Sequence, residues 1–249
     1  MPPDRKSEPR PLSKGLGEAR DRLLRSAALL PAPKRPTDAE RDALADSQRS
    51  AGVVRGALVH RARVPRRYAD LELQKALVPE EALAFLGTWV RGGCVLLAGP
   101  PGSGKTAALV YLLREIWLAG EIVYEEDPGR GYIPRWTAPS MLFVKVRRLY
   151  EATFEKNRAP LREALRADVL ALDDWGAAYE HDWPLAELDG LVDDRWDLGL
   201  PTIVTTNLQA TREAGGAYSF EALAERAFSR LCAAPGPGLV VLDRRDLRR

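Results

Sequence analysis

Gly99-Pro100-Pro101-Gly102-Ser103-Gly104-Lys105-Thr106 fits the pattern G-x-x-x-x-G-K-[ST], and this stretch decides the fold. The apolar residues 94–98 precede it as a buried strand would, and an amphipathic stretch follows it. The glycines let the backbone curl so that successive N–H groups point at an anion, and the helix beginning near Lys105 adds the positive end of its dipole. A surface turn would need neither strand nor helix. We therefore expect residues 99–106 to bind ATP, with Lys105 at the β- and γ-phosphates and Thr106 on Mg²⁺.

Composition fits an intracellular protein with one medium α/β domain and an appendage. The chain has 249 residues, of which 45% are hydrophobic and 29% charged. The first dozen residues are polar and proline-rich, and no apolar run approaches the ~18 residues of a membrane-spanning helix. Cys94 and Cys232 have the spacing of neither a disulfide framework nor a metal site. We expect a cytoplasmic protein without a membrane partner.

Charge divides the chain unevenly. Residues 1–67 carry 16 Lys and Arg against 8 Asp and Glu, a net charge of +8, and residues 68–249 carry 21 against 27, a net charge of −6. A basic arm therefore precedes a mildly acidic domain. Such an arm can contact nucleic acid or an acidic protein surface, or it can be a solvated tail, and charge alone leaves these alternatives open.

Two helices are predicted in the arm. Leu16, Leu23 and Leu30 recur at helical spacing before a stiff proline linker, residues 31–36. After the linker, residues 37–40 (TDAE) indicate a capping box that opens a more polar helix to about Ser50. Neither segment has enough apolar surface to fold alone. We therefore divide the chain into a partner-binding arm, residues 1–63, and a main domain, residues 64–249.

The main domain alternates strands and helices, which predicts a parallel sheet with helices on both faces. Strands are expected at 94–98, 141–146, 169–172, 202–206 and 239–242. Helices are expected at 79–90, 106–119, 147–156, 160–167, 185–196 and 220–231, and residues 121–140 form an insertion that can include a short hairpin. Active sites in such folds lie at the carboxyl ends of the strands.

Polar residues stand at two of these strand ends. Asp173 and Asp174 follow four apolar residues, the form of a Walker B segment, in which we assign Asp173 to the metal and Asp174 to the attacking water. Many ATPases of this kind have a glutamate at the second position, and aspartate is shorter, so hydrolysis can be slow. Asn207 ends the strand 202–206 and suits the group, called sensor 1, that orients water beside the γ-phosphate. Ordinary polar turns also produce both patterns.

Basic residues on two predicted helices suggest further contacts. Arg226 and Arg230 lie four apart, so either could reach the γ-phosphate of a neighbouring subunit, or both could be surface arginines paired with carboxylates. The helix after the second strand has basic residues at both ends and aromatic residues between them. This mixture suits single-stranded DNA, and an ordinary helix with its aromatics in the core is the alternative. The residues are Arg147, Arg148, Tyr150, Phe154 and Lys156.

The motifs resemble those of DnaC/IstB-type AAA+ ATPases, and over residues 64–249 the chain resembles a helicase loader of the DnaC kind. The motifs that carry the resemblance are, in chain order, Val64 to Tyr68 (VPRRY), the phosphate loop, Asp168 to Gly176 (DVLALDDWG), Leu200 to Leu208 (LPTIVTTNL), Glu225 to Leu231 (ERAFSRL) and Asp246 to Arg248 (DLR). The resemblance implies a three-layer AAA+ fold with a five-stranded parallel sheet of order 5-1-4-3-2 and no carboxy-terminal lid domain. It also implies an ATP-dependent oligomer, in which Arg230 is the arginine finger acting in trans and Arg248 is a late basic residue.

The function implied is loading of a replicative DNA helicase, gripped by residues 1–63, onto single-stranded DNA. A transposition helper acting on duplex DNA has the same ATPase core, so the core does not separate the two. An ATP-binding switch that rarely hydrolyses is a further alternative, which Asp174 makes plausible. A small-molecule P-loop kinase is disfavoured because an arginine-rich lid after the core is missing from the sequence.

Overall fold

The computed structural model describes residues 36–70, 78, 93–176, 182–233 and 238–242. The helices expected at 16–30 and 79–90, and Arg248, lie outside these residues. Within the described part of the chain, every helix is too short or too polar to cross a bilayer.

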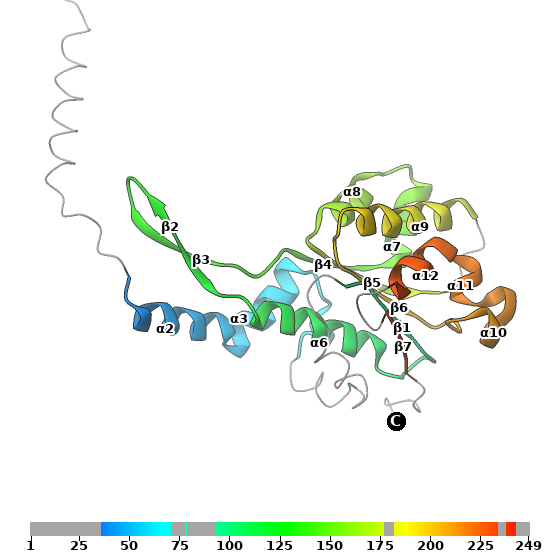
Figure 1. The fold of residues 1–249 in the computed structure, drawn as a ribbon, viewed down its shortest axis with the longest axis horizontal. Helices are drawn as coiled ribbons and strands as arrows, with labels where there is room; N and C mark the ends of the chain where they lie inside the picture. Colours follow the sequence, from blue (N-terminus) through cyan, green and yellow to red (C-terminus); the bar gives the residue numbers. More distant parts are fainter. Residues whose placement is uncertain (1–35, 71–77, 79–92, 177–181, 234–237, 243–249) are drawn as a thin grey trace, which may run out of the picture.

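A five-stranded parallel sheet forms the centre of the domain (Figure 1). Its strands are β1 (Val95–Ala98), β4 (Met141–Lys145), β5 (Val169–Trp175), β6 (Thr202–Thr206) and β7 (Leu239–Val241). They lie in the order β4-β5-β6-β1-β7. Numbered in chain order among themselves, the five strands have the order 5-1-4-3-2, as expected. The labels differ from this numbering only because two strands of a separate hairpin come between the first and second sheet strands along the chain.

Helices cover both faces of the sheet, which explains why β1 and β6 are buried along their whole length. On one face lies α6 (Lys105–Leu118), whose buried Leu109, Leu112 and Ile116 follow the predicted helical spacing. The other face packs against four helices. These are α7 (Val146–Phe154), α8 (Ala159–Arg166), α9 (Asp182–Asp197) and α12 (Glu225–Cys232). The predicted α/β fold is confirmed.

A fully buried arginine joins α9 to the sheet. The Arg195 guanidinium donates hydrogen bonds to the Ala164 and Ala167 carbonyls at 2.8 and 2.7 Å, to the Pro201 carbonyl at 2.7 Å and to Thr202 Oγ1 at 2.9 Å. Burial lowers the pKa of Arg195 to about 10, so it stays cationic at neutral pH. The planar fork of donors thus fixes the amino ends of two neighbouring strands.

The helix expected at 220–231 is broken in two, which corrects the sequence expectation. It consists of α11 (Phe220–Leu223) and α12, separated by Ala224 with φ −140° and ψ 64°. Short helices precede it: α10 (Arg212–Gly215) and the 3-10 turn η3 (Gly216–Tyr218). Propensity alone favours one continuous helix here, so tertiary contacts decide the break.

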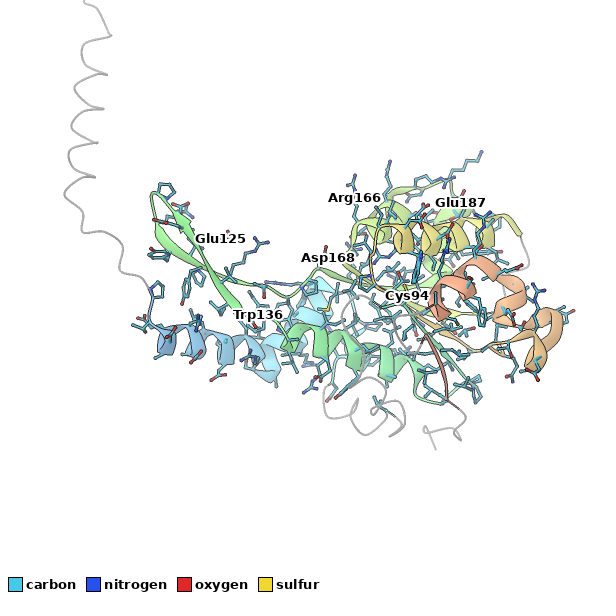
Figure 2. The ribbon with its side chains drawn as sticks, in the orientation of Figure 1. Cys94, Glu125, Trp136, Arg166, Asp168 and Glu187 are labelled. Atoms are coloured by element: carbon cyan, nitrogen blue, oxygen red, sulfur yellow. The ribbon has the colours of Figure 1, made fainter. Side chains whose placement is uncertain are left out.

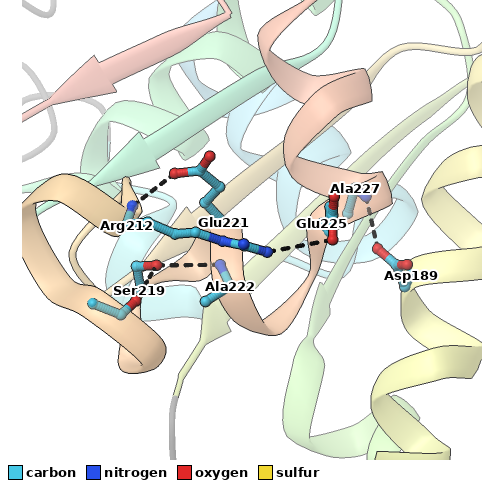
Figure 3. Close-up of polar contacts among 8 residues, drawn as sticks. Asp189, Arg212, Ser219, Glu221, Ala222, Glu225 and Ala227 are labelled. Carbon is cyan, nitrogen blue, oxygen red and sulfur yellow. Dashed lines mark hydrogen bonds and ion pairs between the residues drawn. The ribbon is translucent and has the colours of Figure 1, made fainter.

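Polar contacts from three elements support this break (Figure 3). Ser219 Oγ accepts the Ala222 N–H at 3.1 Å and caps α11. Glu225 accepts from the Arg212 guanidinium at 3.3 Å. Asp189 on α9 accepts the Ala227 N–H at 2.6 Å, which satisfies an amide in the first turn of α12. The start of α12 is therefore set by a carboxylate on a different helix.

The segment before the sheet packs against the main domain. In α2 (Asp38–Arg49), Thr37 and Glu40 form the predicted capping box. The chain continues as α3 (Ala51–Gly56) and one π-helical turn, η1 (Ala57–Arg61), which the sequence did not predict. Val54 and Leu58 are buried in the core over α6, and the Ala62 carbonyl accepts the Phe143 N–H at 2.7 Å. Residues 51–63 therefore contribute four side chains to the domain's core, those of Val54, Ala57, Leu58 and Ala62.

The insertion at 121–140 forms an antiparallel hairpin of β2 (Ile122–Asp127) and β3 (Gly131–Trp136), more regular than expected. Asp127 Oδ1 closes its turn by accepting the Gly129 and Arg130 N–H groups at 2.9 and 2.8 Å. Figure 2 shows Trp136 at the base of the hairpin and Glu125 farther out. There the Trp136 ring lies 5.6 Å from the Arg49 guanidinium of α2.

Candidate nucleotide site

Glycines in the phosphate loop adopt backbone conformations that side chains would strain. Gly102 and Gly104 have φ of 84° and 89°, in the left-handed region. At Gly99, a Cβ would lie 2.3 Å from the Leu242 carbonyl oxygen, so close packing against the end of β7 excludes any larger residue. Gly104 caps α6, so the loop leads directly into the positive end of that helix.

Lys105 is folded over the loop. Its Nζ donates to the Gly99 and Pro100 carbonyls at 2.8 and 2.7 Å, and the residue is buried. Ser103 is also buried, and among the described residues its Oγ has no hydrogen-bond partner. A buried hydroxyl without a partner is costly, and a bound anion would satisfy it.

Asp173 is held by two hydroxyl groups from different elements. Its Oδ1 accepts from Thr106 Oγ1 at 2.8 Å and from Thr205 Oγ1 at 2.9 Å, and its side chain is only 1% exposed. Lys145 Nζ lies 3.4 Å from the other oxygen, Oδ2. The predicted magnesium pair, Thr106 and Asp173, is therefore in direct contact.

Asp174 lies in a left-handed bulge of β5. The strand was expected to end at Leu172, but it runs to Trp175 and its register with β6 shifts between those residues. Asp174 has φ 68°, its N–H donates to Thr205 Oγ1 at 2.8 Å, and its Oδ1 accepts from Asn207 Nδ2 at 2.8 Å. Positive φ is uncommon outside glycine and concentrates at functional positions. The bulge places both carboxylates at one cavity.

A cavity of about 460 Å³ joins these groups. It brings together eight predicted residues, which are Pro101, Gly102, Gly104, Lys105, Thr106, Asp173, Asp174 and Asn207. Four more lining residues, Arg67, Tyr68, Lys145 and Thr205, were assigned no role from the sequence. The sequence did indicate Lys145 and Thr205, because each is the final or penultimate residue of a parallel strand, and the carboxyl ends of such strands converge.

The charges of the cavity fit a polyanion with a divalent cation. Arg67, Lys105 and Lys145 contribute three positive charges, and Asp173 and Asp174 two negative ones. Hydroxyl and carboxylate oxygens are the ligands that Mg²⁺ prefers, and it usually takes one or two from protein together with substrate phosphates. A nucleotide triphosphate with Mg²⁺ therefore fits both the loop and the carboxylates.

Arg230 is not among the residues that line this cavity within the described chain. It lies on α12, where its Nε donates to Asp193 Oδ1 at 2.7 Å and its guanidinium lies 6.0 Å from the Trp196 ring. This hydrogen bond raises the pKa of Arg230. Within one subunit the arginine is thus paired with a carboxylate at a surface groove between α9 and α12. Action on a neighbouring subunit stays a prediction.

The basic and aromatic helix, α7, divides its side chains between core and surface. Tyr150 is buried, whereas Phe154 is 47% exposed, and their rings lie 5.1 Å apart. Arg147 forms an ion pair with Glu151 at 2.7 Å, and Arg148 is exposed. One aromatic ring, that of Phe154, and three cations of the expected DNA-binding mixture, Arg147, Arg148 and Lys156, are therefore exposed.

No protein-family model matches the chain, and no curated protein matches it. Among solved structures, it is similar to a crystal structure of the DnaC helicase loader, with 21% identity, 66% of this chain and 86% of that chain covered, and a TM-score of 0.44. For a DnaI structure the identity is 20%, 72% of this chain and 84% of that chain are covered, and the TM-score is 0.45. For AMPPCP-bound DnaA from Aquifex aeolicus the identity is 16%, 66% of this chain and 44% of that chain are covered, and the TM-score is 0.43. Likeness at these values concerns the backbone alone, and the chemistry of the site rests on its own residues.

Proposed function

We propose that this chain is a Mg²⁺-dependent ATPase that loads a replicative ring helicase onto single-stranded DNA at the start of DNA replication. The observation that carries the ATPase is the meeting, in one cavity, of the phosphate loop with the Thr106–Asp173 and Asp174–Asn207 hydrogen bonds. Phosphoryl transfer depends on positioning and charge stabilisation, and these residues can supply both.

Each residue has a distinct role in this proposal. Lys105 holds the β- and γ-phosphates, while Thr106 and Asp173 hold Mg²⁺, which supplies charge neutralisation when bound. Asp174 accepts a proton from the attacking water, and Asn207 orients that carboxylate. Arg230 of a neighbouring subunit completes the site by stabilising the charge that develops on the γ-phosphate.

Two substitutions test the ATPase. Lys105→Ala should abolish ATP binding, whereas Asp173→Asn should keep most of the affinity and lose Mg²⁺-dependent turnover. Arg162→Ala, which removes an exposed cation on α8, is the control. Binding is measured by calorimetry and turnover by phosphate release. Normal Mg²⁺-dependent hydrolysis by the Lys105 variant would overturn the assignment.

The helicase-loading role is supported by the arm. Its net charge, predicted apolar stripe and proline linker suit a tethered protein-binding segment. The decisive measurement is transfer of a purified replicative ring helicase to single-stranded DNA, followed by strand separation, with and without this protein and ATP. Stimulation supports the loader. ATP-dependent assembly on duplex DNA without stimulation would favour the transposition helper instead.

Single-stranded DNA is the proposed nucleic-acid partner, and α7 the proposed contact. An exposed Phe154 can stack on a base, and Arg148 can contact the backbone. Phe154→Ala should weaken binding of a fluorescent oligonucleotide severalfold while leaving nucleotide affinity unchanged. Single-turnover hydrolysis with and without the oligonucleotide separates an active ATPase from a switch that rarely hydrolyses.

A further inference from the structure

The sheet register places a lysine, unused in the scheme above, beside the metal-binding carboxylate. Lys145 is the last residue of β4 and pairs in register with Asp173 on β5. Residues paired in this way project to the same face of a sheet. Lys145 accordingly lines the same cavity as Lys105 and Thr106, with its Nζ 3.4 Å from Asp173 Oδ2.

The contact between Lys145 and Asp173 is loose. A charge-assisted N–H···O hydrogen bond is typically about 2.7–2.9 Å long, and this one is longer. Asp173 is already fixed through its other oxygen by Thr106 and Thr205. The Lys145 side chain is 37% exposed, in contrast to the buried carboxylate. Lysine has a flexible stem, so its ammonium group can move within the cavity while Asp173 stays in place.

The two lysines of the cavity are held differently. Lys105 is tied to the carbonyls of the phosphate loop, so its charge is fixed at the loop. Lys145 approaches from β4 and lies next to the carboxylate that is assigned to the metal. A metal held by Asp173 would neutralise charge on the terminal phosphates of a bound nucleotide. A cation beside the metal carboxylate is therefore suited to the end of the nucleotide, where a triphosphate and a diphosphate differ.

We propose that Lys145 binds the terminal phosphate of a nucleoside triphosphate and makes this site favour ATP over ADP. The inference rests on the proposed nucleotide site and adds a residue to it. On triphosphate binding, the Lys145 ammonium exchanges Asp173 Oδ2 for a phosphate oxygen, which leaves that carboxylate oxygen available to the metal. Lys145 would then contact substrate directly and provide a second cation at the γ-phosphate.

The test is a comparison of affinities and needs no turnover. The full-length Lys145→Gln variant is titrated with a non-hydrolysable ATP analogue and with ADP, both with Mg²⁺, in a calorimeter. Since a charged hydrogen bond is lost, the analogue should bind about tenfold more weakly or worse, and ADP affinity should stay unchanged. Lys145→Arg keeps the charge and should recover part of the loss. Arg162→Gln, an exposed cation on α8, should change neither affinity.

Other outcomes would overturn the proposal in distinguishable ways. If Lys145→Gln weakens or strengthens both ligands equally, Lys145 only neutralises Asp173, and if it changes neither, Lys145 has no role in binding. If the wild-type protein binds neither ligand, the nucleotide site itself is wrong. A melting curve of Lys145→Gln, expected to match the wild type, separates loss of a phosphate contact from loss of fold.

Discussion

Arg230 on α12 and Asp193 on α9 form a hydrogen bond of 2.7 Å between Nε and Oδ1, away from the cavity that holds the other site residues. The helix that carries Arg230 is itself set by α9, because Asp189 accepts the Ala227 N–H. Both carboxylates thus fix the arginine on the outside of its own subunit. If Arg230 acts on a neighbour's γ-phosphate, it must exchange Asp193 for that phosphate when subunits meet.

The Arg230→Ala variant should therefore bind ATP normally and lose hydrolysis, because the missing guanidinium is the one proposed to act at the nucleotide site of the neighbouring subunit. Removal of an arginine finger costs about 10³–10⁵ in kcat in related phosphoryl-transfer systems. Equilibrium binding and steady-state phosphate release are the measurements.

Mixing variants tests the action in trans. Arg230→Ala combined with Lys105→Ala should recover activity at interfaces that join an intact loop to an intact arginine. Asp193→Asn, which removes the negative charge that holds Arg230, should lower the protein concentration needed for half-maximal activity. Mixed proteins that never exceed the sum of the separate activities would leave action in trans without support.

Asp174→Asn should keep fold and ATP affinity and lose hydrolysis. Asparagine tolerates positive φ at least as well as aspartate, so the bulge at φ 68° should persist. Loss of a general base typically costs about 10²–10⁴-fold in rate. Single-turnover hydrolysis measures the chemical step. Asn207→Ala should slow it less, and the double variant should be no slower than Asp174→Asn alone, because Asn207 acts through that carboxylate.

The site could be predicted where one short motif or one strand end determines it. The phosphate loop needs only its own glycines and the flanking strand and helix, and residues 99–106 have the predicted place between that strand and that helix, while ATP binding there stays a prediction. Asp173 and Asn207 follow from the rule that parallel strands deliver polar groups at their carboxyl ends. Lys145 was missed because its position beside Asp173 depends on the register between β4 and β5, which a single sequence does not display.

Other differences between the predicted and the observed structure arise from contacts between segments that are distant in the sequence. The break at Ala224 depends on Arg212, Ser219 and Asp189, and none of these lies within the predicted helix. The bulge at Asp174 depends on Thr205 and Asn207 of the neighbouring strand. Tertiary contacts override local propensity at such points. Of the two, the bulge at Asp174 lies at the candidate site, where strain is most often retained.

Arg195→Met should destabilise the domain by about 3–5 kcal/mol, because it removes a fully buried network of hydrogen bonds and leaves two buried carbonyls without this donor. The carbonyls of Ala164 and Ala167 would lose the Arg195 donor in one step, and the Pro201 carbonyl would keep only the Leu170 N–H. Urea unfolding followed by circular dichroism gives the free energy of unfolding. Arg166→Met, an exposed arginine on α8, should change it by less than about 0.5 kcal/mol. If the two variants have the same free energy of unfolding, the hydrogen bonds of Arg195 to the strand ends do not stabilise the domain.

The part of the arm that precedes α2 should carry helicase binding and be dispensable for ATP chemistry. The part of the arm from α2 onward should not be dispensable. A protein that begins at Pro36 should bind ATP with wild-type affinity and lose the helicase. One that begins at Val64 also lacks Val54 and Leu58, which are buried in the core. Since each such side chain contributes about 1.5–3 kcal/mol on burial, that shorter protein should unfold at markedly lower urea concentration.

A point substitution separates binding from folding in the full chain. Leu23 belongs to the predicted apolar stripe with Leu16 and Leu30, whereas Leu24 lies about 100° away on a helical wheel. Leu23→Asp should therefore abolish helicase binding, and Leu24→Asp, the same chemical change off the stripe, should weaken it far less. The arginines of the arm should mainly set the association rate and its dependence on salt. If the protein beginning at Pro36 binds the helicase as tightly as the full chain, the arm is a solvated tail or a DNA tether, and the transposition helper becomes the better interpretation.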